Sequence, residues 1–355
     1  ANIMSRPESS LRGASGFTVT GSVTMASFTL VAAIAKKIDA PHLLSAYDSQ
    51  ALQDVMTFEA VEKRMISALR DAVIENGGQS FHRIRNIINQ RLDGYWASAA
   101  PAGGLQANCY QAAYHALEQA TRLFDLRKTY DEGMSYSGAA AMFSAYTKEL
   151  FYFDQFYRVF NENADAVEKA GWDVLKSLRE SVENCYNDWF LENLGLAWGD
   201  FLEDDNGSGL LDNWRLPGIC NQQDFFRKFV APVLKTNPRN RIFVIASDAL
   251  RYESAEEFTR KINSRYRLKA DLSCMLGVLP GFTALGMASL LPHKTLSFTE
   301  KGDVLADGSP VASMEQRGKL LASSEGTAVK ADHLMGMTKD QGREVDAAFK
   351  ALGVE

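Results

Sequence analysis

The sequence predicts a mixed fold, in which a mainly α-helical N-terminal two thirds is followed by a partial α/β domain with a parallel sheet. From Phe58 to about Val233, apolar residues recur at the spacing of one helix face. Beyond residue 236, short strand-like runs alternate with helical stretches. A strand–helix–strand order within one sheet requires the two strands to run parallel. Together, these two patterns predict the fold class.

The helical region contains two clear apolar stripes with charged residues between their members. The stripes are Val61, Met65, Ile66, Leu69 and Val73, and Leu175, Leu178, Val182, Cys185 and Trp189. Breaks at residues 100–104, 131–133 and 204–209 divide the region into several helices. The aromatic-rich segment 146–160 could form a base-stacking platform. A helix that is apolar nearly all round is more simply a central core helix, which we favour.

The α/β region begins with a short β-branched and aromatic run, Ile242–Ala246, which is typical of a strand buried on both faces. We expect a helix from Ala249 to about Asn263. Residues 266–274 then alternate with period two, which predicts a second strand.

After a glycine- and proline-rich turn, the sequence predicts a helix from Thr283 to Leu291. Residues 295–311 carry turn signals at Lys301–Asp303 and Asp307–Gly308, as expected for a small β excursion. The tail from Asp332 to Leu352 again has a helical pattern. We therefore expect a helical domain over 58–236 and a partial α/β domain over 237–355.

The N-terminal segment, residues 1–57, is expected to be partly helical, and its role is unassigned. Its longest uncharged run lies between Arg12 and Lys36 but is rich in threonine, serine and glycine. Such polarity argues against a membrane span or a signal peptide. We interpret the run as a segment with a helix from about Met25 to Lys37, and we expect no membrane partner.

Composition limits the classes of protein that fit. The chain has 355 residues, which suits two domains, and a net charge of -6 argues against a protein that coats nucleic acid. Four scattered cysteines without a C-x-x-C pair argue against a disulfide framework or zinc ribbon. A reducing, cytoplasmic setting is therefore expected.

Two polar residues stand where an open α/β sheet collects its ligands, beyond the carboxyl ends of the strands. Asp248 lies two residues past the first predicted strand, and Thr283 begins the helix after the second. A carboxylate can hold a cation that lowers the pKa of a hydroxyl, which suits metal-assisted phosphoryl or sulfuryl transfer. Equally, each residue could be only a helix cap.

Several separate segments resemble one known family. They are Phe243–Glu253, Met275–Lys294, Asp93–Ser98, Phe151–Phe160 and Trp214–Gly218. Their order and spacing resemble the PglZ family of BREX phage-defence systems, described as phosphatases of the alkaline phosphatase superfamily. The resemblance covers roughly residues 58 to 345, and it implies a metal-dependent phosphatase or phosphodiesterase.

The resemblance also implies roles for the two site residues. In the superfamily, a strand-end aspartate binds one of two metal ions, usually zinc, and a serine or threonine is the nucleophile. Asp248 matches the metal ligand and Thr283 the candidate nucleophile. Gly281 departs from the family's turn, because it replaces an expected hydroxyl residue.

The remaining superfamily ligands, an aspartate–histidine group and an Asp-His pair, have no counterpart that we accept in this sequence. Asp332-His333 is the one adjacent pair that could serve, but it lies in a predicted helical stretch rather than at a strand end. One carboxylate and one hydroxyl cannot hold two zinc ions. The chain therefore looks like a fragment or truncated copy.

Two functions follow as alternatives. The chain is either a metal-dependent hydrolase whose site is half preserved or a non-catalytic scaffold within the defence complex. The expected partners are other proteins of the defence system, and any association with DNA is expected to be indirect. The resemblance implies a divalent metal, with zinc expected, which the hydrolase would bind and the scaffold would not.

Overall fold

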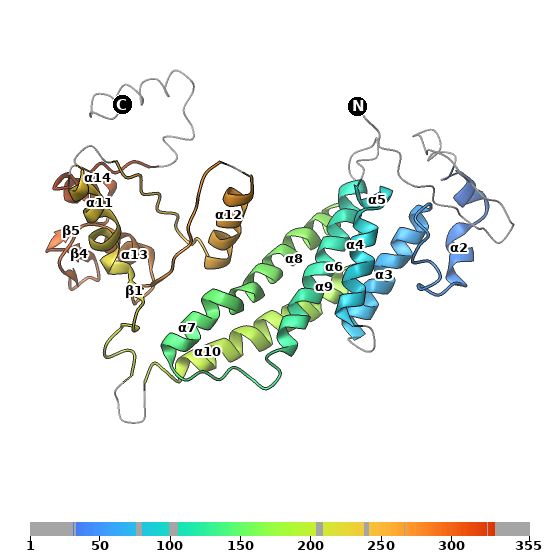
Figure 1. Cartoon of the computed structure of the whole chain (residues 1–355), viewed down its shortest axis with the longest axis horizontal. Coiled ribbons are helices and arrows are strands. Elements are labelled where there is room, and N and C mark those ends of the chain that lie inside the picture. The colour runs from blue at the N-terminus through green and yellow to red at the C-terminus, as the bar shows by residue number, and fades with distance from the viewer. Residues whose placement is uncertain are drawn as a thin grey trace, which may run out of the picture. The chain divides into compact units, whose positions relative to one another are not determined.

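The computed structural model describes residues 31, 33–75, 80–98, 106–203, 209–237, 241–265, 267–324 and 326–330. The chain divides into two compact units, Ala1–Gly207 and Ser208–Glu355, which are described separately (Figure 1). The boundaries expected at 57/58 and 236/237 stay predictions. Most of the helix expected from Met25 to Lys37 and all of the one expected from Asp332 to Leu352 lie outside the described residues. Residues 33–37 are helical.

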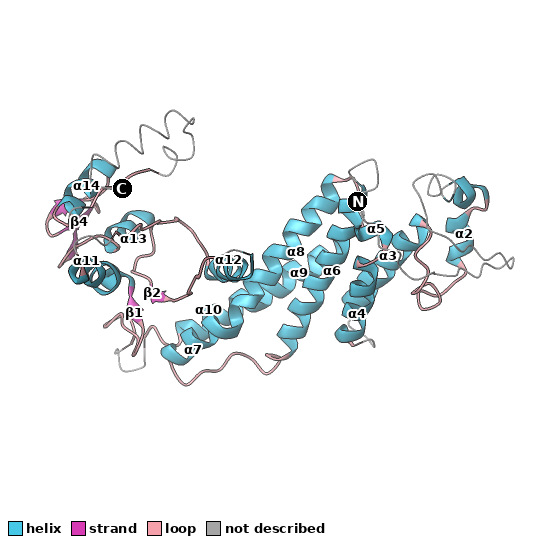
Figure 2. Ribbon diagram, turned by 45° about the horizontal axis from the view of Figure 1, so that its top comes forward, coloured by secondary structure: helices cyan, strands magenta, loops and turns pink. Residues whose placement is uncertain are grey.

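The first unit is built from helices, and every strand among the described residues lies in the second unit (Figure 2). Its helices are α2 (Ala40–Ser45), α3 (Glu59–Glu75), α4 (Phe81–Leu92), α5 (Tyr95–Ser98), α6 (Gln106–Lys128), α7 (Ala139–Ala145), α8 (Phe151–Lys169), α9 (Lys176–Glu183) and α10 (Glu192–Gly199). π-helical turns, η1 (Tyr146–Leu150) and η2 (Asn184–Leu191), join α7 to α8 and α9 to α10 without a break.

The core of the first unit contains the residues that the helical pattern predicts. Nine of the ten stripe residues, all except the half-buried Trp189, are buried in one apolar cluster. The aromatic segment also contributes to this core, since Phe153 is fully buried and stacks on Phe190 with ring centroids 4.3 Å apart. Long stretches of α6 and α8 pack side by side (Figure 1).

A buried guanidinium ties three parts of this unit together. Arg91 of α4 is 1% exposed and donates from Nη1 to Glu62 Oε1 of α3 at 2.8 Å. Its two terminal nitrogens also donate to the backbone carbonyls of Leu52, Gln53 and Val55 at 2.6 to 2.9 Å. Tyr114 of α6 donates its hydroxyl to the other oxygen of Glu62. Burial and the Glu62 charge raise the pKa of Tyr114, so its hydroxyl remains a donor.

The second unit contains a short parallel pair and a small antiparallel sheet. Its elements are β1 (Cys220–Asn221), η3 (Gln222–Asp224), η4 (Phe226–Val230), α11 (Ala231–Thr236), α12 (Tyr252–Arg265), β2 (Met275–Leu276), α13 (Thr283–Ser289), β3 (Leu296–Phe298), β4 (Val304–Ala306), β5 (Ser309–Pro310) and α14 (Met314–Ala322). β1 and β2 are parallel, with Asn221 opposite Leu276. The mixed fold with a parallel sheet is therefore confirmed, as are the helices predicted near 249–263 and 283–291.

The predicted β excursion is also confirmed, as an antiparallel β3–β4–β5 sheet. Asp307 and Gly308 join β4 to β5 with positive φ angles of 48° and 77°. Two positive φ angles in a two-residue loop are the geometry that matches the twist of a hairpin, and Asp-Gly is a favoured sequence for it.

The two predicted core strands are wrong. Residues 242–246 form no strand within the described part of the chain, and Phe243 and Ile245 are 75% and 89% exposed. Residues 267–274 also form no strand. In this segment the backbone of Ala270 bonds a side chain instead of a neighbouring strand. Asn263 Nδ2 donates to the Ala270 carbonyl, and Asn263 Oδ1 accepts from the Ala270 N–H, both at 2.8 Å. Strand pairing starts only at Met275.

Among the helices that the structure describes, none is both long and apolar enough to cross a bilayer.

Replacing Arg91 by methionine is expected to destabilise the helical unit by about 3–5 kcal/mol, because Glu62 would remain buried without its counter-charge. Removing Glu62 as well should cost less than the sum of the two single changes. The matched control is Arg122→Gln, which breaks a surface ion pair with Glu118 and should cost no more than ~1 kcal/mol. Urea unfolding followed by circular dichroism measures all of these. A cost for Arg91→Met as small as that of the control would contradict the assignment.

Replacing Ile245 by lysine should leave unfolding free energy within ~0.5 kcal/mol of the original, since the side chain is already exposed. It should also reduce self-association, because an exposed apolar segment with no strand partner can pair with another chain. Concentration-dependent sedimentation measures the effect. Leu196→Lys is the control, since it replaces an exposed leucine on a helix. Equal self-association of the Ile245 variant and the original chain would show that this segment does not mediate self-association.

Candidate functional site

The structure brings the two predicted site residues together. Thr283 Oγ1 donates to Asp248 Oδ2 at 3.1 Å, and Asp248 Oδ1 lies 3.5 Å away. Asp248 follows segment 242–247, which has no regular secondary structure, and Thr283 is the first residue of α13. The two lie 35 positions apart in the chain, so their proximity depends on the fold of the second unit.

Local backbone geometry helps to orient Asp248. The next residue, Ala249, has a positive φ of 55°, and its N–H donates to Asp248 Oδ1 at 3.1 Å. A positive φ at a residue other than glycine costs free energy and persists only where the surroundings hold it. Asp248 Oδ2 is thus left for the hydroxyl of Thr283, while both side chains stay exposed to solvent.

The pair can align a hydroxyl against a carboxylate, but it does not by itself form a metal centre. Zinc in proteins takes three or four nitrogen, sulfur or oxygen ligands from side chains. The described ranges contain no cluster of three or more His, Cys, Asp or Glu side chains that could hold a metal ion. Asp332 and His333, the adjacent pair in the sequence, lie outside the described residues.

Helix α13, which begins at Thr283, packs against the β hairpin. Leu285 and Ala288 of α13 are buried in a small apolar cluster with Val304 and Ala306 of β4 and with Val311. Asp307 closes the hairpin, because its carboxylate accepts from the backbone N–H groups of Lys294 and Thr295 at 2.8 to 3.1 Å. These backbone bonds hold the pKa of Asp307 below its usual range.

Two side chains for which the sequence predicts no role, Trp214 and Gln222, bind backbone groups of the 277–286 segment around Thr283. A third, Asn221 of β1, binds the backbone carbonyl of Trp214. Trp214 entered the sequence analysis only through the family resemblance. Gln222 has no local pattern that could reveal it, because its partners are 56 and 64 residues further along.

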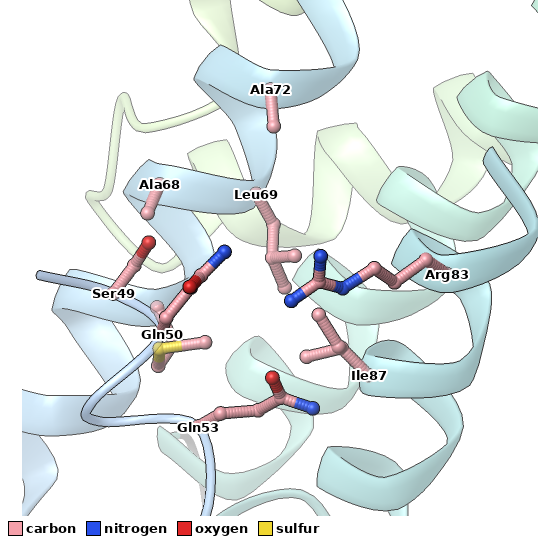
Figure 3. Close-up of a pocket in the computed structure, with 9 residues that line it drawn as sticks. Ser49, Gln50, Gln53, Ala68, Leu69, Ala72, Arg83 and Ile87 are labelled. Carbon is pink, nitrogen blue, oxygen red and sulfur yellow. The ribbon is translucent and has the colours of Figure 1, made fainter. Parts of the chain in front are cut away.

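A cavity in the first unit is too small for a substrate. It lies between the 49–53 turn, α3 and α4, and measures about 30 Å³ (Figure 3). Its lining includes the polar side chains of Gln50, Gln53 and Arg83. Ligand pockets are usually some 300–1,000 Å³, so this space suits a few water molecules at most.

Residues 225–352 match the family model described as "BREX system PglZ alkaline phosphatase-like domain". The alkaline phosphatase-like protein BrxZ of Escherichia coli O9:H4 (strain HS) is 37% identical over 313 residues, which are 87% of this chain and 35% of that protein. The alkaline phosphatase-like protein PglZ of Bacillus cereus (strain H3081.97) is 33% identical over 245 residues, 68% of this chain and 27% of that protein. The chain therefore spans about a third of the length of these relatives. No solved structure matches it significantly.

Acid should loosen the hairpin beneath α13. Because the fold lowers the pKa of Asp307, the carboxylate stabilises the hairpin above its ordinary pKa of about 4, and this contribution is lost as the pH falls through the lowered value. Hydrogen exchange of the Lys294 and Thr295 amides, corrected for intrinsic rates, should become faster below that pH. Asp307→Asn tolerates the positive φ but has no charge to lose, so its protection should not vary with pH in this range. The same pH dependence in both proteins would contradict the role of Asp307.

Proposed function

Because the chain carries a domain of the PglZ family, which confirms the resemblance seen in the sequence, we propose that it contributes the nucleophile side of a phosphoric-ester hydrolase. One observation carries the proposal: Thr283 Oγ1 lies 3.1 Å from Asp248 Oδ2. The sequence resemblance assigns the role of nucleophile to Thr283 and that of metal ligand to Asp248. The match to the family model extends over both residues.

The chemistry assigns a separate role to each side chain. The hydroxyl oxygen of Thr283 attacks phosphorus, the bond from phosphorus to the leaving alkoxide breaks, and the leaving oxygen takes up a proton. Water then hydrolyses the phosphothreonine and releases phosphate. An alcohol is a weak nucleophile until a neighbouring group accepts or polarises its proton, and Asp248 holds that proton in a hydrogen bond.

The family suggests metal dependence, and we propose Asp248 as one ligand of a divalent ion, with zinc the expected metal. Carboxylate oxygen is a suitable donor for zinc. The other ligands would have to come from outside the described residues, since these contain no group of three or more ligating side chains. No step of the reaction above is assigned to the ion.

Because Asp248 and Thr283 alone cannot hold two zinc ions, a non-catalytic scaffold is the second candidate function. In this case the helical unit, with its extensive apolar core, would bind other proteins of a BREX-type defence system in the cytoplasm. Contact with DNA would then be indirect, through those proteins, because the net charge of -6 disfavours broad binding to a polyanion.

Turnover of an aryl phosphate with and without added zinc tests the enzymatic proposal. Thr283→Ala should lower kcat at least ~100-fold, because no other group replaces the attacking oxygen. Thr283→Ser keeps a hydroxyl and should retain part of the activity. Thr129→Ala is the matched control, since it removes an exposed threonine hydroxyl in the first unit, and its kcat should not change.

Asp248→Asn separates the two candidate functions further. It should weaken zinc binding, measured by calorimetry, and lower kcat together with it. Full activity of Thr283→Ala would exclude Thr283 as the nucleophile. An original chain that neither turns over the ester nor binds zinc, but co-purifies with defence-system proteins, would support the scaffold instead.

A further inference from the structure

A single side chain bridges the two ends of the turn that carries Thr283. Gln222 lies directly after β1, and its Oε1 accepts from the N–H of Val278 at 3.3 Å. Its Nε2 donates to the carbonyl of Gly286 at 3.1 Å. Val278 precedes Thr283 by five residues and Gly286 follows it by three, so the amide of Gln222 connects backbone on both sides of the hydroxyl.

Trp214 contacts the same turn, and Asn221 of β1 holds the backbone of Trp214. Trp214 Nε1 donates to the carbonyl of Gly277 at 2.6 Å, next to the Val278 contact. Asn221, which is 4% exposed and opposite Leu276 in the parallel pair, donates from Nδ2 to the carbonyl of Trp214 at 2.7 Å. The segment from Trp214 to Gln222 thus contacts the Thr283 turn through one indole and one amide, and Asn221 holds the backbone of Trp214.

The contacts of Gln222 require both halves of a carboxamide. One end must accept a backbone N–H and the other must donate to a backbone carbonyl, and a neutral amide offers both at the same time. An ionised carboxylate of the same size could accept from Val278 but would face the carbonyl oxygen of Gly286 without a proton. Glutamate at this position is therefore a nearly isosteric change that removes one defined bond.

We propose that Gln222 is a positioning residue, which with Trp214 sets the place of Thr283 Oγ1 against Asp248 by fixing both ends of its turn. The proposal rests on the proposed role of Thr283. It also extends the functional region, because residues 214–222 precede the 225–352 segment that matches the family model yet belong to the same compact unit. The site then depends on chain upstream of the matched domain.

The test compares Gln222→Glu with Gln223→Glu in the full chain. Both changes add one negative charge at adjacent positions, but only Gln222 bonds the turn. Amide hydrogen exchange over 277–286, read by mass spectrometry and corrected for intrinsic rates, should become about tenfold faster in Gln222→Glu, the effect expected for losing a bond to the turn. Gln223→Glu should exchange like the original chain.

The pH dependence of amide exchange in Gln222→Glu distinguishes a hydrogen-bonding role of this side chain from a role in packing alone. Below the pKa of a glutamic acid side chain, about 4.3, the added carboxyl carries a proton and can donate to Gly286 again. Protection of 277–286 in Gln222→Glu, relative to the original chain at the same pH, should therefore recover on acidification. Trp214→Phe, which lacks the indole donor, is a second variant and should also speed exchange at this turn.

Unchanged exchange in both Gln222→Glu and Trp214→Phe would overturn the proposal. So would faster exchange with unchanged kcat for the aryl phosphate in a chain that turns it over, because the turn would then not position the nucleophile. A tenfold fall in kcat with little change in KM would support it. Exchange is measured without substrate, so a failure of Thr283 chemistry, seen in the original chain and Thr283→Ala, is distinguishable from a failure of this inference.

Discussion

The withdrawal of Arg91 from water constrains the whole helical unit. A guanidinium that is 1% exposed must find its partners inside the protein, and its terminal nitrogens take one carboxylate and three backbone carbonyls. Those partners come from α3 and from the turn at 52–55, while Tyr114 of α6 satisfies the other oxygen of Glu62. A shift of α3, α4 or the 52–55 turn by itself would leave Arg91 or Glu62 buried without a hydrogen-bond partner. These contacts therefore fix the positions of the elements around which the apolar side chains pack.

The second unit is organised differently, by directional hydrogen bonds around a small apolar cluster. α13 rests on a few buried side chains of the hairpin, and the parallel pairing of β1 with β2 is two residues long. Polar side chains also contact the segments on either side of α13: Gln222 and Trp214 bind backbone of residues 277–286, and Asp307 binds the backbone of Lys294 and Thr295. Because the buried apolar area of this unit is small, each hydrogen bond contributes a larger share of its stability.

The parts of this fold that could be predicted from sequence are those set by local patterns. Helical periodicity identified the buried stripes, since residues three and four apart share a face wherever the helix lies. Asp307–Gly308 was recognisable as a hairpin turn because both positions require positive φ. The strand predicted over 242–246 was wrong, because β-branched residues favour a strand but do not show which segment, if any, pairs with it. The contacts of Gln222 could not be predicted for the same reason, because no local sequence pattern marks a partner 64 residues away. Asp248 and Thr283 were found through their place between elements and through the family resemblance.

Because Asp248 and Thr283 are both exposed, solvent weakens the electrostatic interactions of the pair. Coulomb attraction between a carboxylate and a charge nearby is about four times weaker in bulk water, with a dielectric constant of ~80, than at a protein surface with an effective value of ~20. Whatever surface comes to lie over this pair would expel that water and strengthen every interaction within it. If Thr283 attacks phosphorus as proposed, a bound substrate that displaces this water would strengthen the hydrogen bond between Thr283 and Asp248.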